Sequence, residues 1–117
     1  NNLANIYAET DLDKGLSTAM KAINEEGETS SSLLDTVGWI LTRKGENEKA
    51  LSYLRKAYAL NSGDAQVRYH TGVTLMQLGR DSEAEKELRA ALVLGEGFEA
   101  RAEVERLVAE LTAKRDR

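Results

Sequence analysis

Histidine and cysteine, two side chains that commonly bind metals or take part in nucleophilic catalysis, are nearly absent from this chain. His70 is the only histidine, and the sequence contains no cysteine. A metal site or a catalytic triad needs several such groups together, whereas a lone imidazole supplies one ligand and no activated nucleophile. We therefore expect His70 to be a partly exposed helix residue, with pH sensing as the smaller alternative.

The other polar clusters also have structural explanations. Ser30–Ser32 lacks the flanking glycines of a nucleophile elbow, so it predicts a loop that leads into a helix. Glu25, Glu26 and Glu28 predict a solvated acidic patch near a helix end. The glycines stand singly and form no phosphate-binding loop. The sequence therefore predicts neither an enzyme nor a cofactor or metal site.

Composition limits the class of partner. The chain has 117 residues, 41% of them hydrophobic and 31% charged, and its formal net charge is −4. We therefore expect one helical domain, with no overall attraction to nucleic acid. The apolar runs are too short for direct membrane insertion. Because Asn1 lies in a helix-like pattern with no initiator Met or signal peptide, we expect a piece of a longer protein.

The most regular feature is a repeat, since Gly38 and Ala50 recur 34 residues later as Gly72 and Ala84. The offset also relates Leu41 to Leu75, Gly45 to Gly79, Leu54 to Leu88, Ala57 to Ala91, Leu60 to Leu94 and Gly63 to Gly97. A fixed period of this size indicates stacked supersecondary units. A glycine inside a helix costs about 1 kcal/mol relative to alanine, so Gly38 and Gly72 predict a close approach of two helix backbones.

Apolar spacing predicts paired helices joined by short turns, which makes neighbours antiparallel. We expect these helices at 1–9, 12–25, 31–44, 47–60, 64–78 and 81–94. The expected N-caps are Ser31 or Ser32, Asn47, Asp64 and Asp81, and Asp35 is placed in a first turn. The expected stops are Lys44–Gly45, Asn61–Gly63 and Leu78–Gly79, where Asn and Gly tolerate the left-handed conformation.

The apolar stripes of the second helices predict the core. They comprise Ala50, Leu51, Leu54, Ala57, Tyr58 and Leu60 in one helix and Ala84, Leu88, Ala91, Leu92 and Leu94 in the other. A last helix at 98–114 breaks the repeat, because Glu105 and Arg106 stand where the small residues of a crossing would be. Its stripe of Ala100, Val104, Leu107, Val108 and Leu111 predicts a lid over the end of the array, with Glu99, Arg101, Glu103, Arg106 and Glu110 facing out.

These residues resemble the tetratricopeptide repeat family, whose helix pairs cross at small residues. The matching positions are Gly38 with Ala50 and Gly72 with Ala84, the further Ala57 and Ala91, the turn residues Gly45 and Gly79, and the large apolar Leu41, Leu54, Leu75 and Leu88. The usual tryptophan is replaced by Leu34 and Arg68, and the usual proline by Ser62 and Glu96. The resemblance implies an all-α, right-handed superhelix of antiparallel helix pairs.

In this interpretation residues 1–117 form one domain of about three repeats and a cap. Its parts are a clipped repeat at 1–30, full repeats at 31–64 and 65–97, and a capping helix at 98–117. The segments 34–39 and 68–72 also resemble the last repeats of long, envelope-associated bacterial members of the family. This implies a larger bacterial scaffold protein, in the cytoplasm or the periplasm.

The resemblance also implies a concave groove lined by the first helix of each pair. The groove candidates by register are Asn2, Asn5, Asp35, Trp39, Arg43, Gln66, Tyr69, His70 and Val73. Of the residues with which some members grip a C-terminal carboxylate, only Asn5 agrees, so we expect no such specificity. Trp39 is expected to be partly exposed beside Tyr69, where it either contacts a ligand or packs on neighbouring helices.

Two functions follow from this interpretation. The first is a protein-interaction module that binds a peptide or partner helix in the groove. The alternative is a structural terminal segment that mediates self-association, in which Leu3, Ile6 and Tyr7 pair two copies of the fragment as a homodimer.

Overall fold

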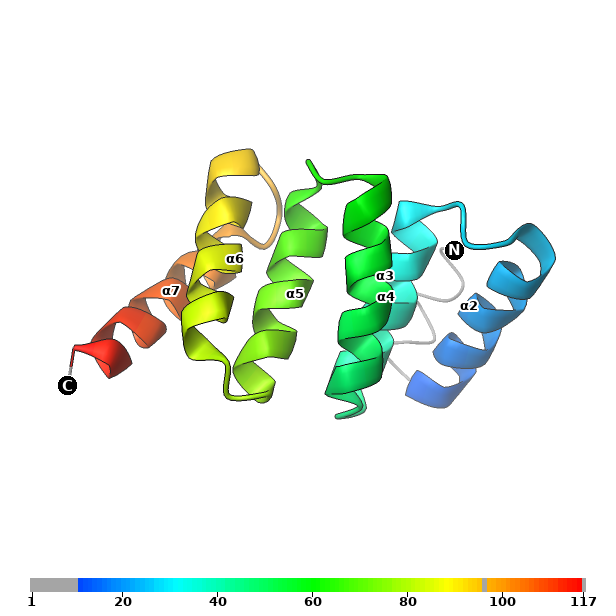
Figure 1. Cartoon of the computed structure of the whole chain (residues 1–117), viewed down its shortest axis with the longest axis horizontal. Coiled ribbons are helices and arrows are strands. Elements are labelled where there is room, and N and C mark those ends of the chain that lie inside the picture. The colour runs from blue at the N-terminus through cyan, green and yellow to red at the C-terminus, as the bar shows by residue number, and fades with distance from the viewer. Residues whose placement is uncertain (1–10, 96, 117) are drawn as a thin grey trace. The chain divides into compact units, whose positions relative to one another are not determined.

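The computed structural model describes residues 11–95 and 97–116, and every regular element in these residues is an α-helix. The chain divides into two compact units, which we call unit 1 (Asn1–Ser62) and unit 2 (Gly63–Arg117). The helices are α2 (Leu12–Glu26), α3 (Ser31–Arg43) and α4 (Asn47–Leu60) in unit 1, and α5 (Ala65–Gln77), α6 (Asp81–Leu94) and α7 (Arg101–Arg115) in unit 2 (Figure 1).

The expected all-α helical repeat is confirmed. Within unit 1, α3 packs against α4 and α2; within unit 2, α6 packs against α5 and α7. The bounds of α4 and α6 are those expected from the sequence, and the other described helices differ by one to three residues at an end. The expected helix at 1–9 lies outside the described residues.

Each helix pair is built around one close crossing. A Cβ atom on Gly38 would lie 2.6 Å from Cγ of Leu54 and 3.3 Å from the carbonyl oxygen of Ala50. In unit 2, a Cβ on Gly72 would lie 2.5 Å from Cγ of Leu88. Real Cβ atoms do not approach so closely, so the fully buried leucine of the second helix fills the space that glycine leaves. The close approach predicted for both glycines is confirmed.

The turns inside the pairs close by the same hydrogen bonds. Gly45 and Gly79 have φ angles of 84° and 76°, a region that favours glycine. The N–H of Glu46 then donates to the carbonyl of Leu41, and the N–H of Arg80 donates to that of Leu75, each at 2.9 Å. This is the Schellman arrangement, which satisfies carbonyl groups at a helix end. The stops expected at Gly45 and Gly79 are therefore confirmed.

Several expected caps are wrong. Asn47 and Asp81 are the first helical residues, while Glu46 and Arg80 occupy the N-cap positions without a side-chain cap bond. The reason is the tight turn, in which the residue after the glycine both closes one helix and opens the next. Asn61 also differs from expectation, because its φ of −151° is not left-handed.

The start of α3 is shifted as well. Ser30, not Ser31 or Ser32, is its N-cap, and its hydroxyl accepts a hydrogen bond from the N–H of Leu33 at 3.1 Å. Asp35 consequently lies past the first turn. The hydroxyl of Ser31 instead donates to the carbonyl oxygen of Ala57 at 2.9 Å, which joins the start of α3 to α4. The expected cap at Asp64 is confirmed, since its carboxylate accepts from the N–H of Gln66 at 2.9 Å.

The core covers less of the second helices than predicted. Ala50, Leu54 and Ala57 are buried in α4, and Ala84, Leu88 and Ala91 are buried in α6. Tyr58, Leu60 and Leu94 are exposed, contrary to expectation. They lie in the final turns of their helices, and the bond between Ser31 and Ala57 shows that the turn after Ala57 extends past the start of α3.

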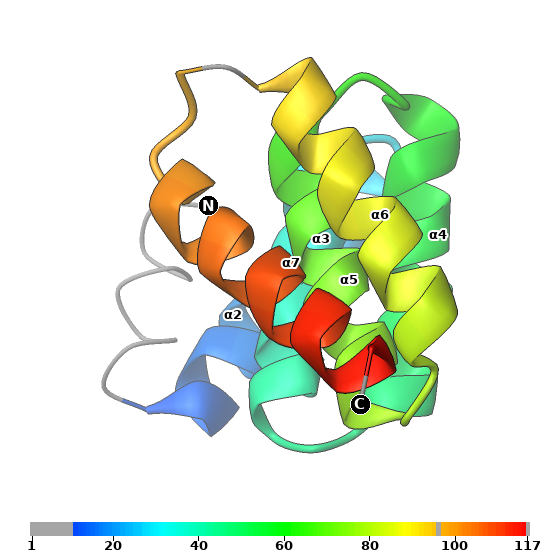
Figure 2. The ribbon, with the colours of Figure 1, turned by 90° about the vertical axis from the view of Figure 1, so that its left-hand side faces the viewer.

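Helix α7 covers α6 as the expected lid. It buries Val104, Leu107, Val108 and Leu111 and lies alongside α6 (Figure 2). Arg101 was expected to face out, but it is half-buried, and its Nη1 atom donates to the carbonyl oxygens of Leu92 at 2.9 Å and Gly95 at 3.3 Å. The guanidinium therefore satisfies carbonyl groups at the end of α6, where a helix leaves them without partners.

The crossing in unit 2 generates a stability prediction. We expect Gly72→Ala to lower the free energy of unfolding by about 1–2 kcal/mol, because overpacking against Leu88 outweighs the gain of about 1 kcal/mol in helix propensity. Urea denaturation followed by circular dichroism measures the change. The matched control is Gly97→Ala, because no atom lies within 4 Å of a Cβ at that position. Equal stabilities of the two variants would contradict the crossing.

Candidate functional site

The predicted groove residues in unit 1 lie along α3. Asp35, Trp39 and Arg43 are spaced four residues apart, so they fall on one side of the helix. Exposure rises along this row: Asp35 is 7% exposed, Trp39 is half-buried and Arg43 is exposed. The indole of Trp39 is thus partly available to solvent, as expected. Asn2 and Asn5 lie outside the described residues.

In unit 2 the predicted residues lie along α5. Gln66 is exposed, and Tyr69 and Val73 are half-buried, which leaves an amphipathic face with one phenol. His70 differs from expectation, because it is only 4% exposed. Its ring lies 5.2 Å from that of Tyr69, centroid to centroid. The buried imidazole of His70 therefore packs near the ring of Tyr69. Its burial disfavours a direct contact between the imidazole and a ligand.

Charged side chains of α7 act on the same surface. Burial raises the pKa of the Tyr69 hydroxyl above its ordinary value, the charge of Glu103 raises it further, and Arg106 opposes the shift. These charges therefore lie close enough to Tyr69 to influence its ionisation. Sequence reasoning placed both residues on the outer face of a lid and missed that this face borders Tyr69. The sequence could have indicated this, because the helix after α6 stands where the first helix of a further repeat would stand.

The charges on α7 are held in place by one another. Arg106 donates to both carboxylate oxygens of Glu103, at 2.7 and 2.9 Å, and to Glu110 at 3.1 Å. The hydrogen bond from Arg106 lowers the pKa of Glu103, and that bond correspondingly raises the pKa of Arg106. We call Tyr69, Val73, Glu103 and Arg106 the α5–α7 surface. It combines an aromatic, an aliphatic and an oriented ion pair, which suits a polypeptide ligand better than a reaction.

Neither a metal centre nor a membrane-spanning helix is found in the described residues. No group of three or more His, Cys, Asp or Glu side chains there could hold a metal ion. Within the same residues, no helix has the length and apolar character needed to cross a membrane.

Repeated helix pairs with the same glycine crossing and the same turn define a helical-repeat protein. The tetratricopeptide repeat family matches residues 41–111, which is more than half of the chain. The chain therefore belongs to the tetratricopeptide repeat family.

Individual relatives extend this comparison. The Photosystem I assembly protein Ycf3 of Acaryochloris marina is 35% identical over 74 residues, which cover 63% of this chain and 45% of that protein. The chain thus spans less than half of this relative.

Two solved structures show the same fold. The type III secretion chaperone SycD of Yersinia enterocolitica, in complex with a peptide of the translocator YopD, gives a TM-score of 0.83 at 18% identity, over 97% of this chain and 90% of that chain. The TPR2B domain of yeast Sti1, in a complex with pHsp70, gives 0.83 at 12% identity, over 95% and 91%.

The electrostatics of Tyr69 can be tested by titration. We expect Glu103→Gln to lower the pKa of the Tyr69 hydroxyl, because it removes a negative charge that disfavours the phenolate. Arg106→Gln should raise this pKa, because it removes the opposing positive charge. Alkaline absorbance titration, with the Tyr69→Phe curve subtracted, isolates this hydroxyl. Glu105→Gln, an exposed carboxylate on the same helix, is the control; if all three variants titrate alike, α7 does not act on Tyr69.

Proposed function

We propose that the chain is a protein-interaction module that binds a peptide or a partner helix, as part of a longer bacterial scaffold protein. The candidate contacts are the exposed face of α3 in unit 1 and, separately, the exposed face of α5 in unit 2. The observation that carries the proposal is the α5–α7 surface. There the oriented Arg106–Glu103 pair acts electrostatically on the half-buried phenol of Tyr69, and the half-buried Val73 lies one turn further along α5. Aromatic side chains with a polar tip and oriented guanidinium groups are the residues that dominate binding energy at interfaces.

The half-buried Trp39 supports the same role in unit 1. Its indole offers a large apolar surface, and the exposed Arg43 lies one helical turn further along α3. A rigid aromatic loses little conformational entropy on binding, so such a residue suits an anchor for a peptide. In this proposal Trp39 contacts the ligand. Asp35 is nearly buried, so it supports Trp39 and does not contact the ligand itself.

The comparisons support a polypeptide ligand by likeness of fold. SycD is solved with a peptide of YopD, and the Sti1 domain with pHsp70. Of the residues that grip a terminal carboxylate in some members, the chain matches only Asn5. Thr36 and His70, two of its residues at those places, are also buried, which disfavours such a contact. The proposed ligand is therefore recognised through internal side chains.

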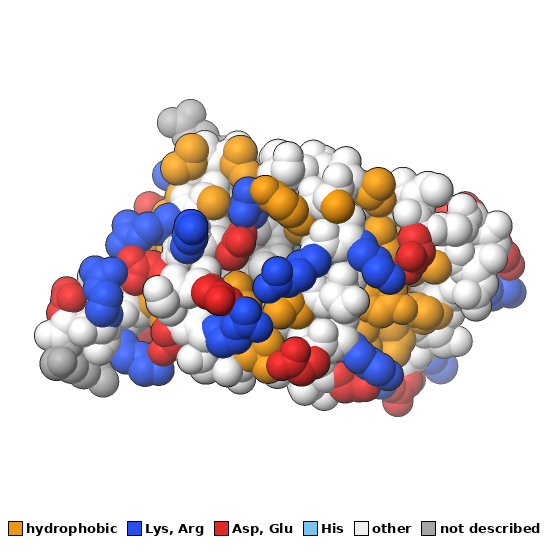
Figure 3. All heavy atoms as spheres, in the orientation of Figure 1, with side chains coloured by type: hydrophobic (Ala, Val, Ile, Leu, Met, Phe, Trp, Pro, Cys, Tyr) orange, Lys and Arg blue, Asp and Glu red, His pale blue; other side chains and the backbone are white. Residues whose placement is uncertain are grey.

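The alternative proposal is a structural segment that mediates self-association. The observation in its favour is exposed apolar surface at the end of α6, where Val93 is 84% exposed and Leu94 is 45% exposed (Figure 3). Such a patch suits contact with another copy of the chain. Because it is remote in sequence from Trp39, Tyr69 and Val73, variants can separate the two functions.

The test selects peptides from a display library against the whole chain and titrates them while Trp39 fluorescence is recorded. Trp39 is the only tryptophan, so its emission reports on α3 alone. We expect bound peptides to shift this emission and to protect it from quenching, because docking removes water from the indole. Tyr69→Ala should weaken binding about 10-fold or more, since truncated aromatic anchors commonly cost over 1 kcal/mol.

The matched control is Tyr58→Ala, which removes an exposed tyrosine from α4, outside the proposed surface. It should leave the affinity unchanged. Sedimentation equilibrium of the chain and of Val93→Asp measures the alternative. Self-association that Val93→Asp abolishes, together with selected peptides that do not respond to Tyr69→Ala, would replace the interaction module with the structural segment.

A further inference from the structure

A cleft of about 600 Å³ lies between α6 and α7 in unit 2, away from Tyr69 and Val73. Its walls come from one side of α6 and from the end of α7, and the buried Leu111 contributes apolar surface. The charged and polar lining residues are Asp81, Ser82, Glu85, Lys86, Arg89, Lys114 and Arg115. No part of the proposed peptide surface is shared with this cleft.

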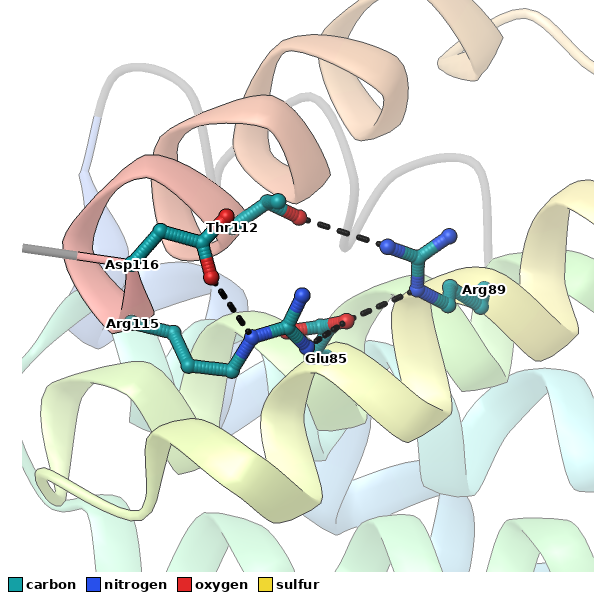
Figure 4. A network of polar contacts seen from close by, with 5 residues as sticks. All are labelled: Glu85, Arg89, Thr112, Arg115 and Asp116. Atoms are coloured by element: carbon teal, nitrogen blue, oxygen red, sulfur yellow. Dashed lines mark hydrogen bonds and ion pairs between the residues drawn. The ribbon is translucent and has the colours of Figure 1, made fainter.

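The carboxylate of Glu85 orients the two arginines that line the cleft. Its side chain is 13% exposed, and one carboxylate oxygen accepts from Nε of Arg89 at 2.9 Å and from Nη1 of Arg115 at 3.0 Å (Figure 4). The hydrogen bond from Arg89 is the main cause that lowers the pKa of Glu85. One carboxylate therefore orients two guanidinium groups that belong to different helices.

The second edge of each arginine is also fixed. Nη2 of Arg89 donates to the hydroxyl of Thr112 at 3.3 Å, and Nε of Arg115 donates to Asp116 at 3.4 Å (Figure 4). In the described part of the chain, Nη1 of Arg89 and Nη2 of Arg115 have no hydrogen-bond partner. Each guanidinium thus keeps donor capacity while its plane is held, and such preorganisation lowers the entropy lost when an anion binds.

The charges of the lining leave an excess of cations. Lys114 pairs with Asp81 at 2.7 Å, and Glu85 is shared by two arginines. Lys86 is exposed and has no ion-pair partner among residues 11–95 and 97–116. Lys and Arg therefore outnumber the carboxylates lining the cleft by four to two, although the whole chain carries a net charge of −4. Like charges gathered without an anion repel one another, so this local excess favours an acidic ligand.

We propose that the cleft between α6 and α7 is a second binding site, which takes an acidic peptide segment of a partner protein. Carboxylates of the segment accept hydrogen bonds from Lys86, Arg89 and Arg115, and an apolar side chain between them contacts Leu111. The proposal is independent of the peptide surface on α3 and α5, because the two share no residue.

The shape of the cleft favours a segment over a small anion. The lining of α6 runs from Asp81 to Arg89, which at 1.5 Å per residue is about 12 Å, or roughly four residues of extended peptide. A single phosphate would span only part of this length. Asp81 and Glu85 also repel a compact dianion, whereas carboxylates spaced along a chain can meet the cations separately.

The test uses the whole chain, labelled for NMR, and a short, blocked peptide of alternating glutamate and leucine. We expect saturable shifts of the amide signals of residues 81–89 and 111–115, and an affinity that falls as salt is raised. Lys86→Glu should weaken binding by about 10-fold or more, because it replaces attraction by repulsion at contact distance. Lys86 makes no ion pair with a described residue, so this change leaves the contacts between α6 and α7 intact.

The matched control is Lys21→Glu, which makes the same charge change at an exposed lysine on α2 in unit 1. It should leave the affinity within about twofold, because Lys21 is not among the residues that line the cleft. The peptide with glutamine in place of glutamate should not bind. Equal losses from both lysine variants, shifts outside the cleft, or displacement of the peptide by millimolar inorganic phosphate would each overturn the proposal.

Discussion

The fold of each unit depends on the contact between a glycine of the first helix and a leucine of the second. Gly38 accommodates Leu54, and Gly72 accommodates Leu88, at distances that leave no room for a β-carbon. Since both leucines are fully buried, the crossing fixes the point along each helix axis at which the two helices meet. The turn at Gly45 or Gly79 then has to close within a few residues. A change of register by one residue would bring a larger side chain to the crossing and separate the helices.

This constraint also decides which surfaces remain for binding. The first helix of each pair presents its glycine face to the second, so the row at Trp39 and the row at Tyr69 are left partly exposed on another side. In unit 2, α7 occupies the open side of α6 and adds its own charges. It therefore closes the core through Val104 and Leu111 while Glu103 and Arg106 extend the face of α5. The side of α7 that covers the core and the side that contributes to the proposed binding surface are therefore opposite sides of one helix.

The sequence predicted the parts that repeat and missed those that depend on single contacts. The bounds of α4 and α6 follow from apolar spacing, and the crossings from paired small residues, because both patterns occur twice. The capping roles of Asn47 and Asp81 were wrong because capping depends on how the preceding turn closes. His70 was expected to be partly exposed because its neighbours in space are not visible in the chain. For the same reason the contribution of α7 to the Tyr69 surface was missed.

The polar residues of unit 2 show how one arrangement serves different ends. Arg101, Arg106 and Arg115 all project from α7. Their hydrogen-bond partners differ, and so does the number of guanidinium donors that stay available. Arg101 is committed to carbonyl groups at the end of α6, so its role is structural. Arg106 donates to two carboxylates of its own helix, which orients it without tethering α7 to α6. Arg115 shares Glu85 with Arg89, and this joins two helices while one nitrogen of each guanidinium keeps its donor capacity. The proposed cleft therefore rests on a carboxylate that orients two guanidinium groups without using all of their donors, together with the local excess of cations.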